Sequence, residues 1–189
     1  MADITTSQLT TSFSDTDAQS YTTASITPSA DKLILVAVEN RTTGQSAATP
    51  EPTLSGNGLT YVSVVSKTVG NDLSRVTLFR AMGASPSAGA ITITIGGAGN
   101  IYGSWSVTEF TNMDTTGTNG SGAIVQSASN ADENTNTGLT VTLAAFGDVN
   151  NATYGAARTA GDGTAKITPG TGFTELGENG STDTDFQAQ

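Results

Sequence analysis

A carboxylate and an aromatic ring lie close together in the sequence at Glu109 and Trp105. Glycosidases place a carboxylate beside an aromatic platform, and they also need a second carboxylate roughly 5 to 10 Å away. The only obvious distant partners are Glu175 and Asp114. No paired-carboxylate motif accompanies Glu109, so we expect it to face solvent or to pair across strands with an arginine. The arginines in question are Arg75 and Arg80.

Three aromatic residues, Trp105, Tyr102 and Tyr61, are the candidates for stacking on sugar rings. Flat aromatic faces supply the apolar contact area that carbohydrate-binding modules use. The strand-like alternation around Trp105 favours the other interpretation, in which this side chain is the core aromatic of a β-sandwich.

Two aspartate pairs, Asp15 with Asp17 and Asp183 with Asp185, have the two-residue spacing of calcium ligands. Neither pair continues into the Asp/Asn-Gly-to-Glu pattern of an EF-hand loop. Solvated turns are therefore the favoured interpretation, and we expect no metal and no cofactor.

The composition argues against most catalysis, because the 189 residues include no histidine and no cysteine. Thiol nucleophiles, cysteine-type zinc sites and histidine-dependent triads are thereby excluded. The net charge of −10, from 17 acidic and 7 basic residues, disfavours nucleic acid and anionic membranes as partners. We expect a protein that is not an enzyme.

Short β-branched runs separated by Gly, Asn, Pro and Ser predict an all-β, antiparallel β-sandwich. Lys32–Glu39 is a continuous apolar run and predicts a central strand buried on both faces. Ala90–Ile95 alternates strictly, which places its three isoleucines on one face. Asn57-Gly58 predicts a hairpin with a type I′ turn. The other expected strands are 8–13, 21–26, 59–69, 75–82, 102–110, 123–128, 139–146, 152–158 and a short last one near Ile167 and 173–176.

The run from Thr111 to Gly122 is rich in Thr, Asn and Gly and follows the expected strand around Trp105. Recognition usually resides on such loops when a rigid scaffold carries them. This loop is our candidate contact surface, with Thr111, Asn112, Asp114, Thr116 and Asn119 as its contact residues.

Several strings resemble a β-sandwich domain of predicted bacteriophage and marine viral proteins. They include SITPSADKLILVAVENR, PTLSGNGLTYVSV, SWSVTEFTNMDTTGTNGSGAIVQSASN, GLTVTLAAFGDVNNATYGA and ITPGTGFTELGE. The likeness covers about residues 25–178 and carries no catalytic motif. It implies a jelly-roll or lectin-like sandwich displayed on a phage particle.

The expected domain organisation is an N-terminal arm or first strand at residues 1–20, the sandwich at 21–178, and a polar tail at 179–189 that is frayed or ordered by a partner. The family pattern continues past FTELGE into a polar strand and a closing apolar strand. We therefore expect a sandwich that lacks its last strands, with an open sheet edge covered by a neighbouring subunit or left by truncation.

Two functions follow as expectations. The first is a virion structural protein, namely a capsid-decorating, fibre or tail-associated subunit that binds other virion proteins or copies of itself as a homo-oligomer. The second is a glycan-binding adhesion module on a phage appendage or cell surface. The start, MADITTSQLTTSF, has neither the basic nor the apolar region of a signal peptide. Two expectations remain: export without a signal peptide, or assembly in the host cytoplasm and later release, which a virion component would meet.

Overall fold

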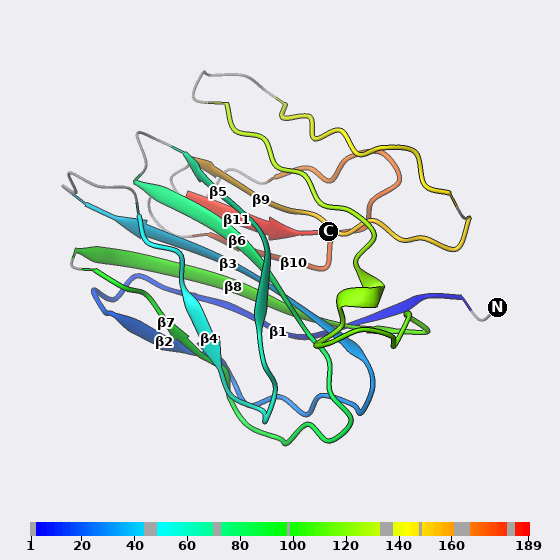
Figure 1. The fold of residues 1–189 in the computed structure, drawn as a ribbon. Helices are drawn as coiled ribbons and strands as arrows, with labels where there is room; N and C mark the ends of the chain where they lie inside the picture. The colour runs from blue at the N-terminus through cyan, green and yellow to red at the C-terminus, as the bar shows by residue number, and fades with distance from the viewer. Residues whose placement is uncertain are drawn as a thin grey trace.

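The fold is an all-β assembly of antiparallel sheets (Figure 1), seen in a computed structural model that describes residues 3–43, 49–69, 73–97, 99–132, 138–147, 149–160, 167–180 and 184–189. These described residues form eleven strands and one short 3₁₀ helix. The strands are β1 (Thr5–Ser14), β2 (Ser20–Thr22), β3 (Leu33–Thr42), β4 (Thr53–Ser55), β5 (Val62–Val69), β6 (Ser74–Ala81), β7 (Thr92–Thr94), β8 (Asn100–Thr111), β9 (Ala156–Ala160), β10 (Gly177–Gly180) and β11 (Thr184–Ala188); the 3₁₀ helix is η1 (Ser121–Ala123).

The largest sheet has the strand order β1-β8-β3-β6-β5, and every neighbouring pair in it is antiparallel. β3 lies at its centre, and all but one of its residues are buried. Val36 pairs with Val107 of β8 on one side and with Phe79 of β6 on the other. The prediction of a central strand buried on both faces is confirmed, because a run without polar alternation has no face that it can offer to water.

One face of this sheet packs against the small sheet β2-β7-β4 (Figure 1). The alternation predicted for Ala90–Ile95 is confirmed, since Ile91, Ile93 and Ile95 are at most 1% exposed. These isoleucines join Val36, Val38 and Val107 in the main hydrophobic core. Full burial of one such side chain stabilises the fold by roughly 1.5 to 3 kcal/mol.

The opposite face of the large sheet carries a third sheet, with the order β10-β11-β9 (Figure 1). Arg158 of β9 reaches Glu39 of β3, and Asn179 of β10 reaches Thr11 of β1. The polar tail expected at 179–189, frayed or ordered by a partner, is instead ordered within this chain over its described residues, which form the end of β10 and all of β11. Phe186 in β11 is fully buried, because the strand pairs on both edges and packs on the large sheet.

The Asn57-Gly58 turn forms as predicted, but the hairpin does not. Asn57 and Gly58 have φ values of 55° and 64°, and the Leu59 N–H donates to the Gly56 carbonyl at 3.1 Å. The strands on either side pair elsewhere, β4 with β7 and β5 with β6. The turn therefore links two sheets, and a positive-φ turn alone does not specify that its flanking strands pair.

Further strand predictions need correction. Neither 123–128 nor 139–146 forms a strand, and 173–176 is an irregular segment that precedes β10. The expected strand at 152–158 begins later, as β9. Residues 5–14, within the part predicted as an arm or a first strand, form the edge strand β1.

Candidate functional site

Two of the three candidate sugar-stacking residues lie inside the protein. Trp105 is 4% exposed and packs against Tyr21 with ring centroids 6.0 Å apart, and Tyr102 is 3% exposed. Neither ring face is open to a ligand, so the sugar-stacking alternative fails for these two residues, and the favoured interpretation of Trp105 as the core aromatic of the sandwich is confirmed. Tyr61 is half-buried against the main core, and its hydroxyl donates to Oδ1 of Asn57 at 3.1 Å.

Glu109 neither faces solvent nor pairs with an arginine, so both expectations for it are wrong. It is 8% exposed, and its two carboxylate oxygens accept hydrogen bonds from the Ser29 N–H at 2.7 Å and the Ser29 hydroxyl at 3.0 Å. Arg75 instead donates to the carbonyl of Thr49 and to the hydroxyl of Ser66. Glu109 thus holds the turn before β3 in place, which is a structural role.

The Thr111–Gly122 loop has a defined conformation at the end of β8. Asn112 takes a positive φ of 60° and donates from Nδ2 to the Asp3 carbonyl at 2.6 Å. The Asp114 carboxylate accepts the Thr116 N–H at 2.7 Å, and this bond holds the pKa of Asp114 below its ordinary value. The hydroxyls of Thr111 and Thr5 are 2.5 Å apart.

Arg80 forms hydrogen bonds to the second half of the same loop. Its guanidinium donates to the carbonyls of Thr118 at 2.9 Å and Asn119 at 2.6 Å. Gly120 follows with φ 78°, and a Cβ at that position would come within 2.9 Å of the Leu33 side chain. The loop is held firmly, while the side chains of Asp114 and Thr116 stay exposed. The predicted contact residues therefore share one ordered surface.

The chain then continues into two extended stretches, 124–132 and 138–147, which we call the ribbon (Figure 1). Side-chain bonds join them: Gln126 donates to the Ala144 carbonyl at 2.8 Å and accepts the Ala144 N–H at 2.9 Å. Asn130 donates to the Thr140 carbonyl at 2.8 Å. The ribbon replaces the two strands that the sequence predicts there.

Large apolar side chains of the ribbon are exposed to solvent. The exposed fractions are 65% for Val125, 49% for Leu139, 45% for Val141 and 37% for Phe146. Large apolar side chains exposed along one segment make that segment a candidate interaction surface. The ribbon leaves the body at Ile124, which packs on a second apolar cluster around Leu33. The sequence signal for this surface is the apolar alternation in GLTVTL, which begins the strand expected at 139–146.

A buried ion pair joins the large sheet to the third sheet. Glu39 is fully buried and accepts a hydrogen bond from Nε of Arg158 at 3.0 Å. Burial raises the pKa of Glu39 to about 7, although the charge of Arg158 acts in the opposite direction. A strongly shifted pKa can mark a catalytic group. Here the carboxylate is enclosed between two layers, so its role is to connect them.

Two further findings bear on ligands and membranes. Across the described ranges, no group of three or more acidic residues gathers closely enough to form a metal site of that kind. Asp183 lies outside the described residues, and Asp185 is 3% exposed in β11, so the solvated turn expected for this pair is wrong at Asp185. The part of the chain that the structure describes contains no helix long and apolar enough to cross a bilayer.

These features define a protein class, an all-β antiparallel sandwich with an ordered loop and an exposed apolar ribbon on its surface. No protein-family model, curated protein or solved structure matches the chain at a significant level.

Proposed function

We propose that this protein is a structural subunit that works through protein–protein contacts, and that its setting is a virion, as a capsid-decorating, fibre or tail-associated component. The observation that carries the contact function is the exposed ribbon. The virion setting rests on the resemblance of the strand strings to phage and marine viral sandwich domains.

The ribbon has the properties of an interaction surface. Leu139 and Val141 alternate with threonines along an extended backbone that belongs to no sheet. Such a backbone offers N–H and C=O groups to a strand from another molecule, and apolar side chains supply specificity in that binding mode. The neighbouring loop, with Asp114 and Thr116 exposed, would supply the polar rim that surrounds the apolar centre of most interfaces.

The partner is a protein, either another virion component or a second copy of this chain. The net charge of −10 disfavours nucleic acid. Glycan binding ranks below protein binding, because Trp105 and Tyr102 are buried and Tyr61 is only partly accessible. A glycan array is the measurement that would reverse this order: saturable binding that survives disruption of the ribbon would favour the adhesion module.

The ribbon is tested by placing a charge in it. We expect Val141→Asp to weaken association with particles or with itself by at least about tenfold, which is about 1.4 kcal/mol, because the carboxylate would have to be desolvated in an apolar contact. Thr22→Asp is the matched control, since it adds the same charge at an exposed strand position of the small sheet. Light scattering coupled to size exclusion, together with electron microscopy of particles, measures self-association and copy number.

Two results would reject the proposal. One is a parent protein that is monomeric at high concentration and is absent from purified particles. The other is equal association by Val141→Asp and the parent. Particles that lack the protein, remain intact and adsorb poorly to cells would favour the adhesion module instead.

A further inference from the structure

The two outer strands of the large sheet, β1 and β5, differ in how well their free edges are protected. β5 carries the exposed Lys67, and its register with β6 shifts between Ser63 and Val65. The hydroxyl of Ser127 in the ribbon also donates to the Val64 carbonyl at 3.5 Å. Charges, bulges and covering segments are the devices that prevent an edge strand from pairing with another chain. The β5 edge is therefore protected.

The edge of β1 lacks most of this protection. No charged residue occurs in β1, and no strand of the described residues pairs with its outer edge. Its register with β8 shifts between Gln8 and Thr10, but the segment Thr10–Ser14 that follows pairs with β8 without interruption. Phe13 lies in this segment and is 40% exposed. Thr10–Ser14 is therefore an open, uncharged edge with one large apolar side chain.

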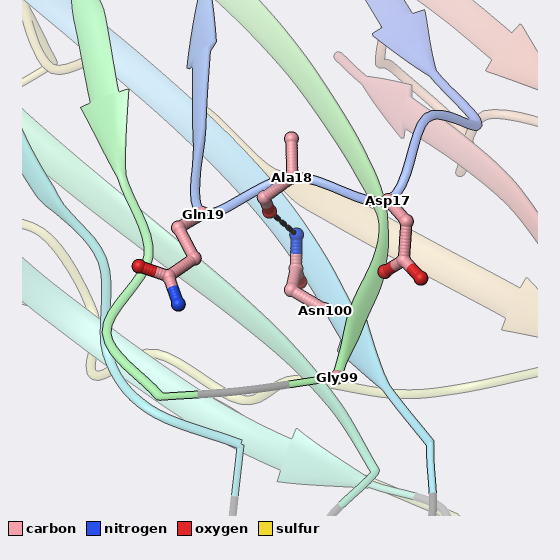
Figure 2. Close-up of a pocket in the computed structure, with 5 residues that line it drawn as sticks. All are labelled: Asp17, Ala18, Gln19, Gly99 and Asn100. Atoms are coloured by element: carbon pink, nitrogen blue, oxygen red, sulfur yellow. Dashed lines mark hydrogen bonds between the residues drawn. The ribbon is translucent and has the colours of Figure 1, made fainter.

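The chain that follows β1 is held in place at the start of β8. Nδ2 of Asn100 donates to the Ala18 carbonyl at 2.9 Å, as the dashed line in Figure 2 shows. The Tyr21 hydroxyl donates to the Thr16 carbonyl at 2.9 Å. A segment that is ordered before binding loses less conformational entropy when a partner adds to it. The open edge of β1 is thus already in a conformation that can accept a strand.

The second stretch of the ribbon, 138–147, has the properties of a donor strand. Backbone groups of Thr140 and Ala144 bind side chains of the first stretch. Because backbone groups of an extended strand point alternately to its two sides, those of Leu139 and Val141 point away from the first stretch. Within the described residues, no hydrogen bond engages them. The stretch carries no charge and offers a free edge with apolar side chains.

The ribbon and the edge of β1 lie at opposite ends of the large sheet. The ribbon contacts β5, whereas β1 is at the other end of the strand order β1-β8-β3-β6-β5. Adjacent strands are about 4.8 Å apart, so four intervals separate the two outer strands by roughly 19 Å. Figure 1 shows the same separation, with β8, β3 and β6 between them. The ribbon therefore meets a β1 edge only on another molecule.

We propose that the 138–147 stretch of one copy adds to the Thr10–Ser14 edge of a second copy as an extra strand. This inference rests on the proposed contact function of the ribbon and names its partner. Main-chain hydrogen bonds supply affinity in such strand addition, and side chains supply specificity. Phe13 of the acceptor offers apolar surface to Leu139 and Val141 of the donor. Both segments are uncharged, so they meet without the repulsion between two molecules of net charge −10.

The contact is head-to-tail, because each copy presents its ribbon to one neighbour and its β1 edge to another. Contacts of this kind build closed rings when the rotation between copies closes, and filaments when it does not. Assembly should therefore continue beyond a dimer as the protein concentration rises.

Two variants that block opposite ends of the molecule test this pairing. Val141→Asp places a charge in the donor stretch, and Phe13→Asp places one on the acceptor edge. We expect each variant alone to associate at least about tenfold more weakly than the parent, measured by light scattering coupled to size exclusion. An equimolar mixture of the two should form a dimer and stop there. Only the intact ribbon of one variant and the intact β1 edge of the other can pair.

Thr22→Asp is the matched control, because it adds the same charge at an exposed position of the small sheet and should assemble like the parent. A capped peptide with the sequence of residues 138–147, GLTVTLAAFG, should bind Val141→Asp and not Phe13→Asp. Circular dichroism verifies that each variant is folded. Phe13→Ala is the milder second variant: it removes the apolar surface without adding a charge, and it should also weaken assembly.

The outcomes separate this inference from the proposed function. A mixture of the two blocked variants that stays monomeric, while the parent assembles, would overturn head-to-tail pairing. Assembly of Phe13→Asp and Phe13→Ala like the parent shows that β1 is not the acceptor, and weakened assembly of Val141→Asp would then still support the ribbon as the contact surface. A parent that is monomeric alone but present on purified particles overturns self-pairing only. Equal assembly of Val141→Asp and the parent rejects both.

Discussion

Asn57 illustrates how much one residue can contribute to the join between two sheets. Its backbone takes φ 55°, a left-handed conformation that most side chains resist and asparagine tolerates. Its Nδ2 donates to the carbonyls of Ser87 at 3.0 Å and Gly89 at 2.9 Å, and its Oδ1 accepts from Tyr61. The side chain therefore ties the turn after β4 to the segment that leads into β7.

We expect Asn57→Ala to destabilise the protein by about 2 to 3 kcal/mol. The substitution leaves two carbonyls and one hydroxyl without their partner and also forces alanine into positive φ. Asn119→Ala is the control for the cost of placing alanine at positive φ. The φ of Asn119 is 52°, and Arg80 binds its carbonyl rather than its side chain. Urea denaturation measures both. Equal losses in the two variants would show that the Asn57 hydrogen bonds add nothing.

At the scale of elements, β11 is the strand that organises the third sheet. It pairs with β10 on one edge and with β9 on the other. Phe186 at its centre is fully buried and faces the large sheet, as does its pairing partner Arg158. Composition alone suggests a polar tail here, whereas the two-sided pairing makes this strand an interior one.

Phe186→Ala should therefore cost about 3 to 5 kcal/mol, the usual penalty for deleting a buried aromatic side chain. Phe13→Ala is the matched control, because Phe13 is 40% exposed on the edge strand β1 and its loss should cost less than about 1 kcal/mol. Thermal or urea unfolding compares the two variants. A Phe186→Ala protein as stable as the parent would contradict the burial of β11.

At the scale of the whole molecule, the two faces of the large sheet differ in polarity. This difference determines which interactions hold each neighbouring sheet in place. One face is apolar, with Val36, Val38 and Val107 in the main core. The other face carries Glu39, Ser104 and Ser106, all buried under the third sheet. Hydrogen bonds and the Glu39–Arg158 pair thus connect the third sheet to the large sheet. The stability of this contact therefore depends on whether Glu39 is protonated, as well as on the burial of side chains.

The pH dependence of unfolding should reveal this connection. Burial raises the pKa of Glu39 from its ordinary 4.5 to about 7, so the folded state holds the proton more tightly than the unfolded state. The resulting stabilisation is complete below pH 4.5 and is lost as the pH rises through 7. Relative to Glu39→Gln, we expect the parent to lose on the order of 1 to 3 kcal/mol between pH 5 and pH 8.

Urea unfolding of the parent and of Glu39→Gln at several pH values measures that difference. Asp31→Asn corrects for the change in net charge, since it removes an exposed acid from a turn. A stability difference that is constant with pH, or that grows in favour of the parent as the pH rises, would show that Glu39 does not titrate in this way.

Local sequence by itself determined the features that depend on nearest neighbours. The unbroken apolar run of β3 predicted a strand buried on both faces, and the alternation around Ile93 predicted one apolar face. Asn57-Gly58 predicted a positive-φ turn, and the absence of histidine and cysteine excluded the chemistry that needs them. Each of these inferences rests on backbone sterics or on side-chain chemistry within a few residues.

Only the tertiary structure decided which surfaces stay open and which are covered. Glu39 and Arg158 are 119 residues apart in the sequence and form a buried pair. Trp105 is covered, whereas the alternating GLTVTL stretch is not. Strand pairing and burial arise between segments distant in the chain, so a strand-like pattern specifies a conformation without specifying its neighbour. The exposed ribbon and the buried Glu39–Arg158 pair both arise from that non-local choice.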